Sequence, residues 1–208
     1  MKQTTALALM VISTALYGAS GVTAARAADL PKVAESCTNC HGQGGVSKDS
    51  AVPTIAGYSD AYISDSLTAY KSKERPCPET KVLDGPDKGK AIDMCRVAEA
   101  LSDSDVEQIA KYFGSLKFVR AQQSVDPELA KKGAEIHESG CENCHSESGS
   151  AASDDSGMLA GQWMPYLKQS IDEFKSGKRP MGKKMKTKID ALQPADIDAL
   201  VNYYGSFK

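Results

Sequence analysis

The chain has 208 residues, 25 of them basic and 27 acidic, and a formal net charge of −2 at neutral pH. This near balance gives no indication of nucleic-acid binding, which calls for a clear excess of basic charge. Aromatic residues make up only 6 % of the chain, so one or two domains of this length would have small cores and would gain from extra apolar volume.

The first 27 residues have the order of a secretory signal peptide. Lys2 precedes an uncharged run that includes Ile12, and Ala25-Arg26-Ala27 matches an A-x-A cleavage site. Small and polar residues interrupt this run, so it makes a poor membrane span, and an uncleaved anchor is the alternative. We therefore predict a signal peptide over residues 1–27, export to the periplasm, where disulfides can form, and a mature chain without a membrane span.

A five-residue pattern, C-x-x-C-H, occurs twice in the chain, at residues 37–41 and 141–145. This pattern attaches c-type haem, because two thiols on one helical turn reach the two vinyl groups of one porphyrin and the adjacent histidine binds the iron. A dithiol redox pair or a zinc site shared by the four cysteines would leave the histidine after each pair unexplained. We predict two covalently attached haem c groups, held by Cys37, Cys40, His41, Cys141, Cys144 and His145.

The two motifs lie in two copies of one sequence. A shift of 104 residues brings matching residues of 37–76 onto 141–180, and a shift of 91 aligns 101–117 with 192–208. The change of shift means that the first copy has 13 extra residues between Pro76 and Leu101. The sequence therefore predicts two homologous domains. Their bounds are 28–120 and 121–208, and a short connecting segment over 118–126 should keep them packed together.

Each copy indicates three helices, and neither shows the sustained alternation of a strand. Asp126-Pro127 is typical of a helix start, with an N-cap followed by proline at the first position. Apolar residues from Val106 to Phe113 recur at helical spacing after Ser102-x-x-Asp105, which resembles a capping box. We predict an all-α fold of two tandem domains, each wrapped around one covalently attached haem.

Two methionines occupy equivalent places in the repeat. Met94 lies seven residues before Leu101, and Met185 lies seven residues before Leu192. A methionine thioether is a common axial partner of histidine in cytochromes c and raises the reduction potential. We predict that the irons are bound by His41 with Met94 and by His145 with Met185, against the alternative that these methionines fill gaps in the core.

Cys77 and Cys95 bracket the 13 extra residues of the first copy. A disulfide between them would close the inserted loop at its base and leave no free thiol in an exported protein. The alternative is a Cys95 thiolate that competes with Met94 for the iron. We prefer the disulfide.

Three further features allow two interpretations each. His137, the only histidine outside the motifs, fits a surface or helix-packing role better than a ligand role. Trp163 and Tyr166 could hydrogen-bond haem propionates or simply line a core edge. The stretch between Phe174 and Ile189 has seven basic residues and no acidic one. It could steer an acidic partner, or it could be a solvated loop that partly neutralises propionates.

With these residues in place, the chain resembles the two-haem class I cytochromes c, and more closely the cytochrome subunit of flavocytochrome c, a sulfide dehydrogenase. The second copy carries the resemblance, in CENCHSESG and LAGQWMPYLKQSIDEFKSGKRPMGKKMK. A proline whose carbonyl holds the proximal histidine matches Pro53, but Gly157 stands at the equivalent place in the second copy. The second copy therefore lacks the proline that would orient His145.

The resemblance implies a protein that transfers electrons and has no catalytic residues of its own. An FAD-containing sulfide dehydrogenase subunit would supply the electrons, and a soluble cytochrome or an oxidase would accept them. Two other hypotheses stay open. One is a free-standing dihaem carrier that serves a terminal oxidase. The other is a dihaem thiosulfate dehydrogenase that uses Cys95 or an open iron position.

Overall fold

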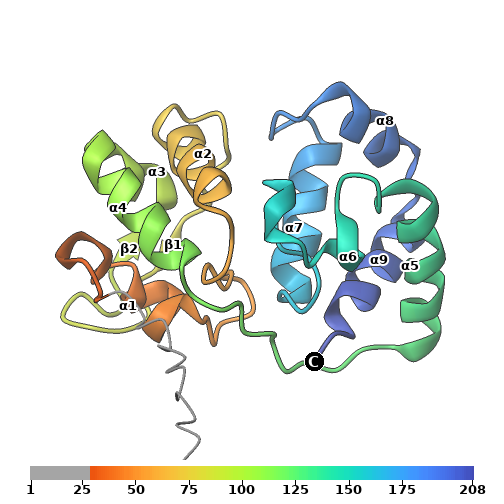
Figure 1. The fold of residues 1–208 in the computed structure, drawn as a ribbon, viewed down its shortest axis with the longest axis horizontal. Helices are drawn as coiled ribbons and strands as arrows, with labels where there is room; N and C mark the ends of the chain where they lie inside the picture. Colours follow the sequence, from red (N-terminus) through yellow and green to blue (C-terminus); the bar gives the residue numbers. More distant parts are fainter. Residues whose placement is uncertain (1–28) are drawn as a thin grey trace, which may run out of the picture.

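The computed structural model describes residues 29–208. The predicted signal peptide falls on residues 1–27 and so lies outside the described residues. Within the described range, no helix has both the length and the apolar character needed to cross a membrane. Figure 1 shows two helical domains side by side, with the chain passing from one to the other at the lower edge of the molecule.

The first domain begins with short turns, followed by three helices and a small hairpin inserted between the first and second of these helices. Its elements are η1 (Lys32–Ala34), α1 (Thr38–His41), η2 (Gln43–Gly45), α2 (Asp60–Lys71), β1 (Thr80–Lys81), β2 (Ala91–Ile92), α3 (Met94–Glu99) and α4 (Asp103–Gly114). The α2 helix packs on both α3 and α4. Phe113 of α4 is fully buried at the centre of this core.

The second domain repeats this plan without the hairpin. Its elements are α5 (Pro127–Gly140), α6 (Ser146–Gly149), η3 (Ala152–Asp154), α7 (Met164–Lys175), α8 (Lys183–Ala191) and α9 (Pro194–Gly205). The α5 and α9 helices pack closely because Gly133 faces the backbone of Ala199, where a Cβ would come within 2.2 Å of the carbonyl oxygen. Larger side chains at this crossing would push the two helices apart.

The predicted all-α fold of two cytochrome-like domains is confirmed, and so are two of the expected helix starts. Ser102 and Asp105 form a complete capping box at α4. The Asp126 side chain accepts hydrogen bonds from amides in the first turn of α5. Pro127, at the first position of this helix, has no N–H group and so leaves no donor unsatisfied. These local signals place the helices that frame each motif.

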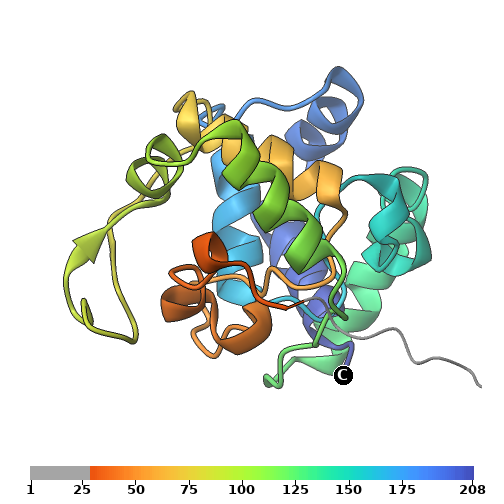
Figure 2. The same ribbon diagram turned by 60° about the vertical axis from the view of Figure 1, so that its left-hand side comes forward.

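The inserted segment of the first domain contains the strands, which the sequence pattern did not indicate. β1 and β2 pair antiparallel, with Thr80 opposite Ile92 and Lys81 opposite Ala91. Each strand has only two residues, too few for an alternating pattern to be visible in the sequence. Figure 2 shows this hairpin standing out from the first domain.

Hydrogen bonds between equivalent positions of the two copies join the two domains. Gln162 is fully buried, and its amide donates to the Thr54 carbonyl (2.9 Å) and to the Tyr58 hydroxyl (2.9 Å). Tyr58 in turn donates to the Met158 carbonyl (3.4 Å). The shift of 104 equates Tyr58 with Gln162 and Thr54 with Met158, so the interface has approximate two-fold symmetry. Polar groups buried in this way fix one relative placement of the domains.

Candidate haem sites

A cavity of about 430 Å³ lies in the first domain, between the first motif, α2, α3 and the start of the hairpin. Four of the predicted site residues line it together: Cys37, Cys40, His41 and Met94. Apolar side chains such as Ile63, Leu67 and Val97 form much of the remaining wall. Residues that are 57 positions apart in the chain thus face one cavity.

His41 is held in the orientation that a proximal ligand needs. Its side chain is buried, and Nδ1 lies 2.8 Å from the carbonyl oxygen of Pro53. An Nδ1–H bonded to this carbonyl leaves Nε2 as the atom available to a metal. Burial lowers the pKa of His41, despite the opposing hydrogen bond to Pro53. The imidazole is therefore kept in the neutral form that binds iron.

The first cysteine of the first motif is a half-buried thiol with a raised pKa. Burial raises the pKa of Cys37 to about 11, so this thiol is not the low-pKa thiolate of a dithiol redox site. Among the residues from 29 onward, the four motif cysteines do not gather into one group of metal ligands. Both findings favour haem attachment over the redox and zinc alternatives.

Arg75 supplies a test of whether the cavity fits a haem. It lines the cavity and is 6 % exposed, with its guanidinium 4.5 Å from the centre of the Tyr70 ring. Nη2 donates to the Tyr166 hydroxyl (2.8 Å), but Nε has no acceptor among the described residues. A buried guanidinium with an unused donor calls for an anion. A haem carboxylate would provide one, so the residues present fit the group.

Tyr166 shows the effect of this cationic surrounding. Burial opposes its ionisation, but the positive charges of Arg75 and Arg179 outweigh burial and hold its pKa below the usual value. Arg179 also approaches Tyr62, with Nη2 3.5 Å from the hydroxyl. Each domain therefore places a tyrosine against the arginine of the other, and α7 contributes Tyr166 to the wall of the first cavity.

The second motif lies between α5 and α6. Cys141 caps the end of α5 and is half-buried, Cys144 is exposed, and His145 precedes α6. Burial lowers the pKa of His145, as it does for His41. Met185 is half-buried on α8, which packs on α7. The pairing of His145 with Met185 stays a prediction.

The orientation of His145 depends on a residue that the sequence analysis missed. The Ser156 side-chain oxygen lies 3.1 Å from Nδ1 of His145 and can also donate to the Cys144 carbonyl. Ser156 directly precedes Gly157, which stands where the first copy has Pro53. A hydroxyl therefore takes the place of the proline carbonyl beside this histidine. A polar residue next to the missing proline was the available signal.

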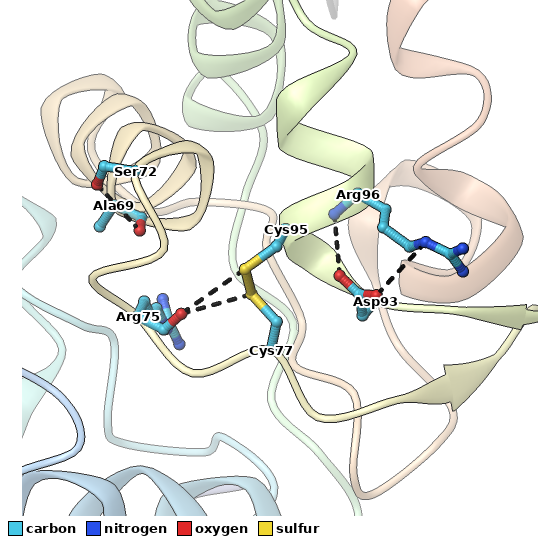
Figure 3. Close-up of a disulfide and its surroundings, with 7 residues drawn as sticks. All are labelled: Ala69, Ser72, Arg75, Cys77, Asp93, Cys95 and Arg96. Atoms are coloured by element: carbon cyan, nitrogen blue, oxygen red, sulfur yellow. Dashed lines mark hydrogen bonds and ion pairs between the residues drawn. A yellow bond between two sulfur atoms is a disulfide. The ribbon is translucent and has the colours of Figure 1, made fainter.

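Cys77 and Cys95 are joined in a disulfide, with their Cα atoms 5.7 Å apart. Figure 3 shows the bridge beside the Arg75 carbonyl oxygen, which lies 3.4 Å and 3.9 Å from the two sulfurs. A bonded sulfur has no thiolate charge to offer a metal, so the Cys95 ligand alternative does not fit this structure. Met94 remains the sulfur ligand candidate of the first cavity.

Comparison with known proteins adds the family. Residues 27–117 match the family described as cytochrome c, and residues 128–203 match cytochrome c oxidase, cbb3-type, subunit III. Cytochrome c4 of Stutzerimonas stutzeri is 30 % identical over 183 residues, which are 80 % of this chain and 82 % of that protein. The chain belongs to the cytochrome c4 family.

Two further relatives extend the likeness. The structure of cytochrome c4 from Acidithiobacillus ferrooxidans superimposes with a TM-score of 0.68 at 27 % identity, covering 83 % of this chain and 99 % of that one. A thiosulfate dehydrogenase electron acceptor of Thiomonas intermedia is 27 % identical over 74 % of this chain and 71 % of that protein. The prediction of a two-domain class I cytochrome c with two haem c groups is therefore confirmed.

The residues around the two candidate sites indicate how this chain would hold its haems. When bound, haem supplies a one-electron couple. The buried His41 and the half-buried Met94 line one cavity, where fixed side chains limit rearrangement as the charge changes. Pro53 and Ser156 orient the two histidines, and Arg75 offers a buried positive charge to an anionic substituent.

Replacing Arg75 by leucine is expected to lower the reduction potential of the first haem. Loss of a buried positive charge from the wall of the first cavity would favour the ferric state of a haem held there by on the order of 50 mV. Spectroelectrochemical titration of the mature protein checks this. Arg96→Leu is the matched control, because Arg96 is exposed. Equal potentials in the Arg75 variant and the parent would contradict the assigned contact.

His137 forms a buried network beside the second motif. It is 2 % exposed, with Nδ1 2.9 Å from the Tyr204 hydroxyl and Nε2 2.5 Å from Glu142. Glu142 also accepts hydrogen bonds from the Glu147 and Ser148 amides, so the network ties α5 and α9 to the turn after the motif. The equivalent residues of the first copy are Val33, Phe113 and Thr38. His137 thus has a packing role rather than a ligand role.

A double-mutant cycle tests this network. His137→Val and Tyr204→Phe each leave a buried polar atom unpaired, so each should lower the free energy of unfolding by about 1–3 kcal/mol. The double variant restores the apolar pair of the first domain and should cost about 1 kcal/mol less than the sum. Urea unfolding measures all three. Tyr203→Phe is the control, and strict additivity would argue against the network.

Proposed function

We propose that this member of the cytochrome c4 family is a periplasmic electron carrier. In this proposal it accepts electrons from a sulfur-oxidising dehydrogenase and delivers them to a soluble cytochrome or a terminal oxidase. The observation that supports it best is the placing of His41 and Met94 on one cavity. With both axial positions of the first iron supplied by the chain, no position is left for a substrate, which suits electron transfer without catalysis.

The proposed attachment and ligand set follows the repeat. Cys37 and Cys40 would hold the first haem and Cys141 and Cys144 the second. His41 with Met94 and His145 with Met185 would fill the axial positions of the two irons. Because no ligand is exchanged, each transfer changes only the oxidation state of the iron.

Two classes of donor suit this carrier. One relative is described as a thiosulfate dehydrogenase electron acceptor, which supports a thiosulfate-oxidising donor. The stretch from Cys141 to Lys186 resembles the cytochrome subunit of flavocytochrome c, which supports an FAD-containing sulfide dehydrogenase as a bound partner. Both donors release electrons from reduced sulfur in the compartment where c-type cytochromes mature. We place the thiosulfate-oxidising donor first.

Reduction by purified donors tests the proposal. The oxidised mature protein is mixed with a catalytic amount of thiosulfate dehydrogenase and thiosulfate, or of the flavoprotein subunit of flavocytochrome c and sulfide. Haem absorbance is then followed. We expect full reduction of both haems by one of these donors, at least tenfold faster than with the sulfur compound alone. Failure with both donors would overturn the proposal.

Two companion measurements separate the alternatives. Reduction by thiosulfate without any added enzyme, with catalytic turnover, would identify the chain as a thiosulfate dehydrogenase. Purification from the native host with stoichiometric FAD would favour the flavocytochrome c arrangement over a free carrier.

A further inference from the structure

The helices that carry the two candidate methionines differ sharply in charge. The shift of 91 aligns four residues of α8 with two residues just before α3 and two residues within α3. The α8 residues are all lysine: Lys183, Lys184, Lys186 and Lys188. Their first-domain counterparts are Ile92, Asp93, Cys95 and Val97, of which three line the first cavity and the fourth forms the disulfide. The duplication has thus produced one basic methionine helix and one that is not.

The lysines of α8 are exposed and little neutralised. All four are solvent-exposed. Lys186 pairs with Asp190 at 2.7 Å, whereas Lys183, Lys184 and Lys188 have no ion-pair partner in the described part of the chain. Lys183 and Lys184 lie in the first turn of α8, where the helix dipole disfavours positive charge. Helix stability alone therefore gives no reason for lysine at these positions.

This basic surface adjoins the second haem motif. A Cβ placed on Gly140 would come within 3.8 Å of Lys188 Cδ, so the Lys188 side chain passes over the residue that precedes Cys141. Met185 lies on the same helix between Lys184 and Lys186. The uncompensated positive charge of α8 is consequently placed at the side of the second site, as Figure 1 shows for α8 above α5 and α6.

The corresponding side of the first motif is covered. The hairpin tip at Gly85 reaches Asn39, the residue between the two motif cysteines, where a Cβ would come within 2.8 Å of Asn39 Oδ1. Gly85 has a φ of +78°, which suits this close approach. Val82 and Asp87 of the hairpin line the cavity, and the disulfide fixes the base of the hairpin. The second domain has no such insertion.

We propose that the lysines of α8 form a docking surface for an acidic redox protein, and that electrons are exchanged with this partner through the second domain. The first haem, shielded by the hairpin, would be reached from the second across the domain interface. The inference rests on the proposed carrier function and adds the partner's chemistry and the point of exchange. Charge complementarity of this kind steers encounter and raises association rates.

The oxidation kinetics of the reduced mature holoprotein test the exchange site. The variant Lys183→Glu/Lys184→Glu/Lys188→Glu is compared with Lys88→Glu/Lys117→Glu/Lys131→Glu, which changes the net charge equally at exposed lysines away from α8. Ferricyanide is the anionic probe. Each ferricyanide takes one electron and becomes ferrocyanide, with no bond broken. We expect the α8 variant to be oxidised about tenfold more slowly than the parent at low salt, with little difference at high salt.

Equal slowing in the control variant, or no slowing in the α8 variant, would overturn the exchange site. An intermediate rate for Lys183→Gln/Lys184→Gln/Lys188→Gln supports a charge effect, and an unchanged ferric methionine band shows that the haem site has stayed intact. If the charge-reversed protein loses that band, the glutamine variant decides, and a rate equal to that of the parent counts against the proposal.

Poly-L-glutamate tests the acidic partner directly. We expect its addition to shift amide NMR signals of α8 in the parent and in the control variant, but not in the α8 variant. Shifts confined to other lysines would contradict the proposal, as would binding to phosphatidylglycerol vesicles with no response to poly-L-glutamate, which would indicate a membrane surface instead. Neither measurement uses a sulfur donor, so failure here is distinguishable from failure of the proposed donor.

Discussion

Replacing Met94 and Met185 by alanine, singly and together, is expected to remove the ferric methionine–sulfur absorption band in two equal steps. The two methionines are equivalent in the repeat, and Met94 lines the same cavity as His41. Loss of the thioether also removes a ligand that favours ferrous iron. The reduction potential of the affected haem should fall on the order of 0.2 V, within the roughly 0.8 V range that axial ligands span.

The matched control for this experiment is Met181→Leu. Met181 lies close to Met185 in the chain but aligns with Cys77 of the first copy, so it has no equivalent methionine there. Its replacement should leave the band and both potentials unchanged. A band that persists in the double alanine variant would show that the ligand assignment is wrong. A single variant that loses the whole band would show that only one iron has a methionine ligand.

The internal repeat allows candidate site residues to be predicted, because haem attachment depends on a short sequence pattern. C-x-x-C-H is a five-residue signal, and comparison of two copies selects Met94 and Met185 from the seven methionines of the chain. Helix starts at Ser102 and Asp126 are likewise local, since each cap bonds to amides within three residues. Features of this range need no knowledge of the tertiary fold.

Contacts between distant residues were not predictable in the same way. Gln162 bonds to Thr54 across 108 positions, and nothing in the neighbourhood of either residue marks the pairing. The hairpin over Asn39 was missed because two-residue strands carry no periodicity. The sequence leaves a surface or a packing role open for His137, because its partners Tyr204 and Glu142 come together only when α5 and α9 pack. Tertiary packing decides these interactions, and local propensity does not reveal it.

The interface contacts also bear on how the two haems work together. Arg75 and Tyr166 meet at 2.8 Å, and α7 of the second domain closes part of the first cavity. The unused Nε of Arg75 therefore lies at the side of the first cavity that faces the second domain. An anionic haem substituent bound there would be close to the boundary between domains. The buried polar contacts that fix the interface thus also fix the geometry for transfer between haems.

Removing the disulfide by Cys77→Ser/Cys95→Ser is expected to destabilise the first domain by about 3 kcal/mol, because the bridge closes a loop whose ends are 18 positions apart. Denaturant unfolding of the mature holoprotein measures this change. Cys95 directly follows Met94 in α3, so a loosened hairpin should also weaken the methionine–sulfur band of the first haem. The second haem should be unaffected, since its domain lacks the insertion.

Thiol titration supplies the control for this variant. The unfolded, unreduced holoprotein should show no free thiol, because the four motif cysteines are predicted to attach haem and the other two form the bridge. Two thiols should appear after reduction, and none in the serine variant. Two free thiols before reduction would contradict the bridge. If the bridge forms yet its loss changes neither stability nor the first methionine band, the hairpin is held by its contacts with Asn39 and the cavity wall.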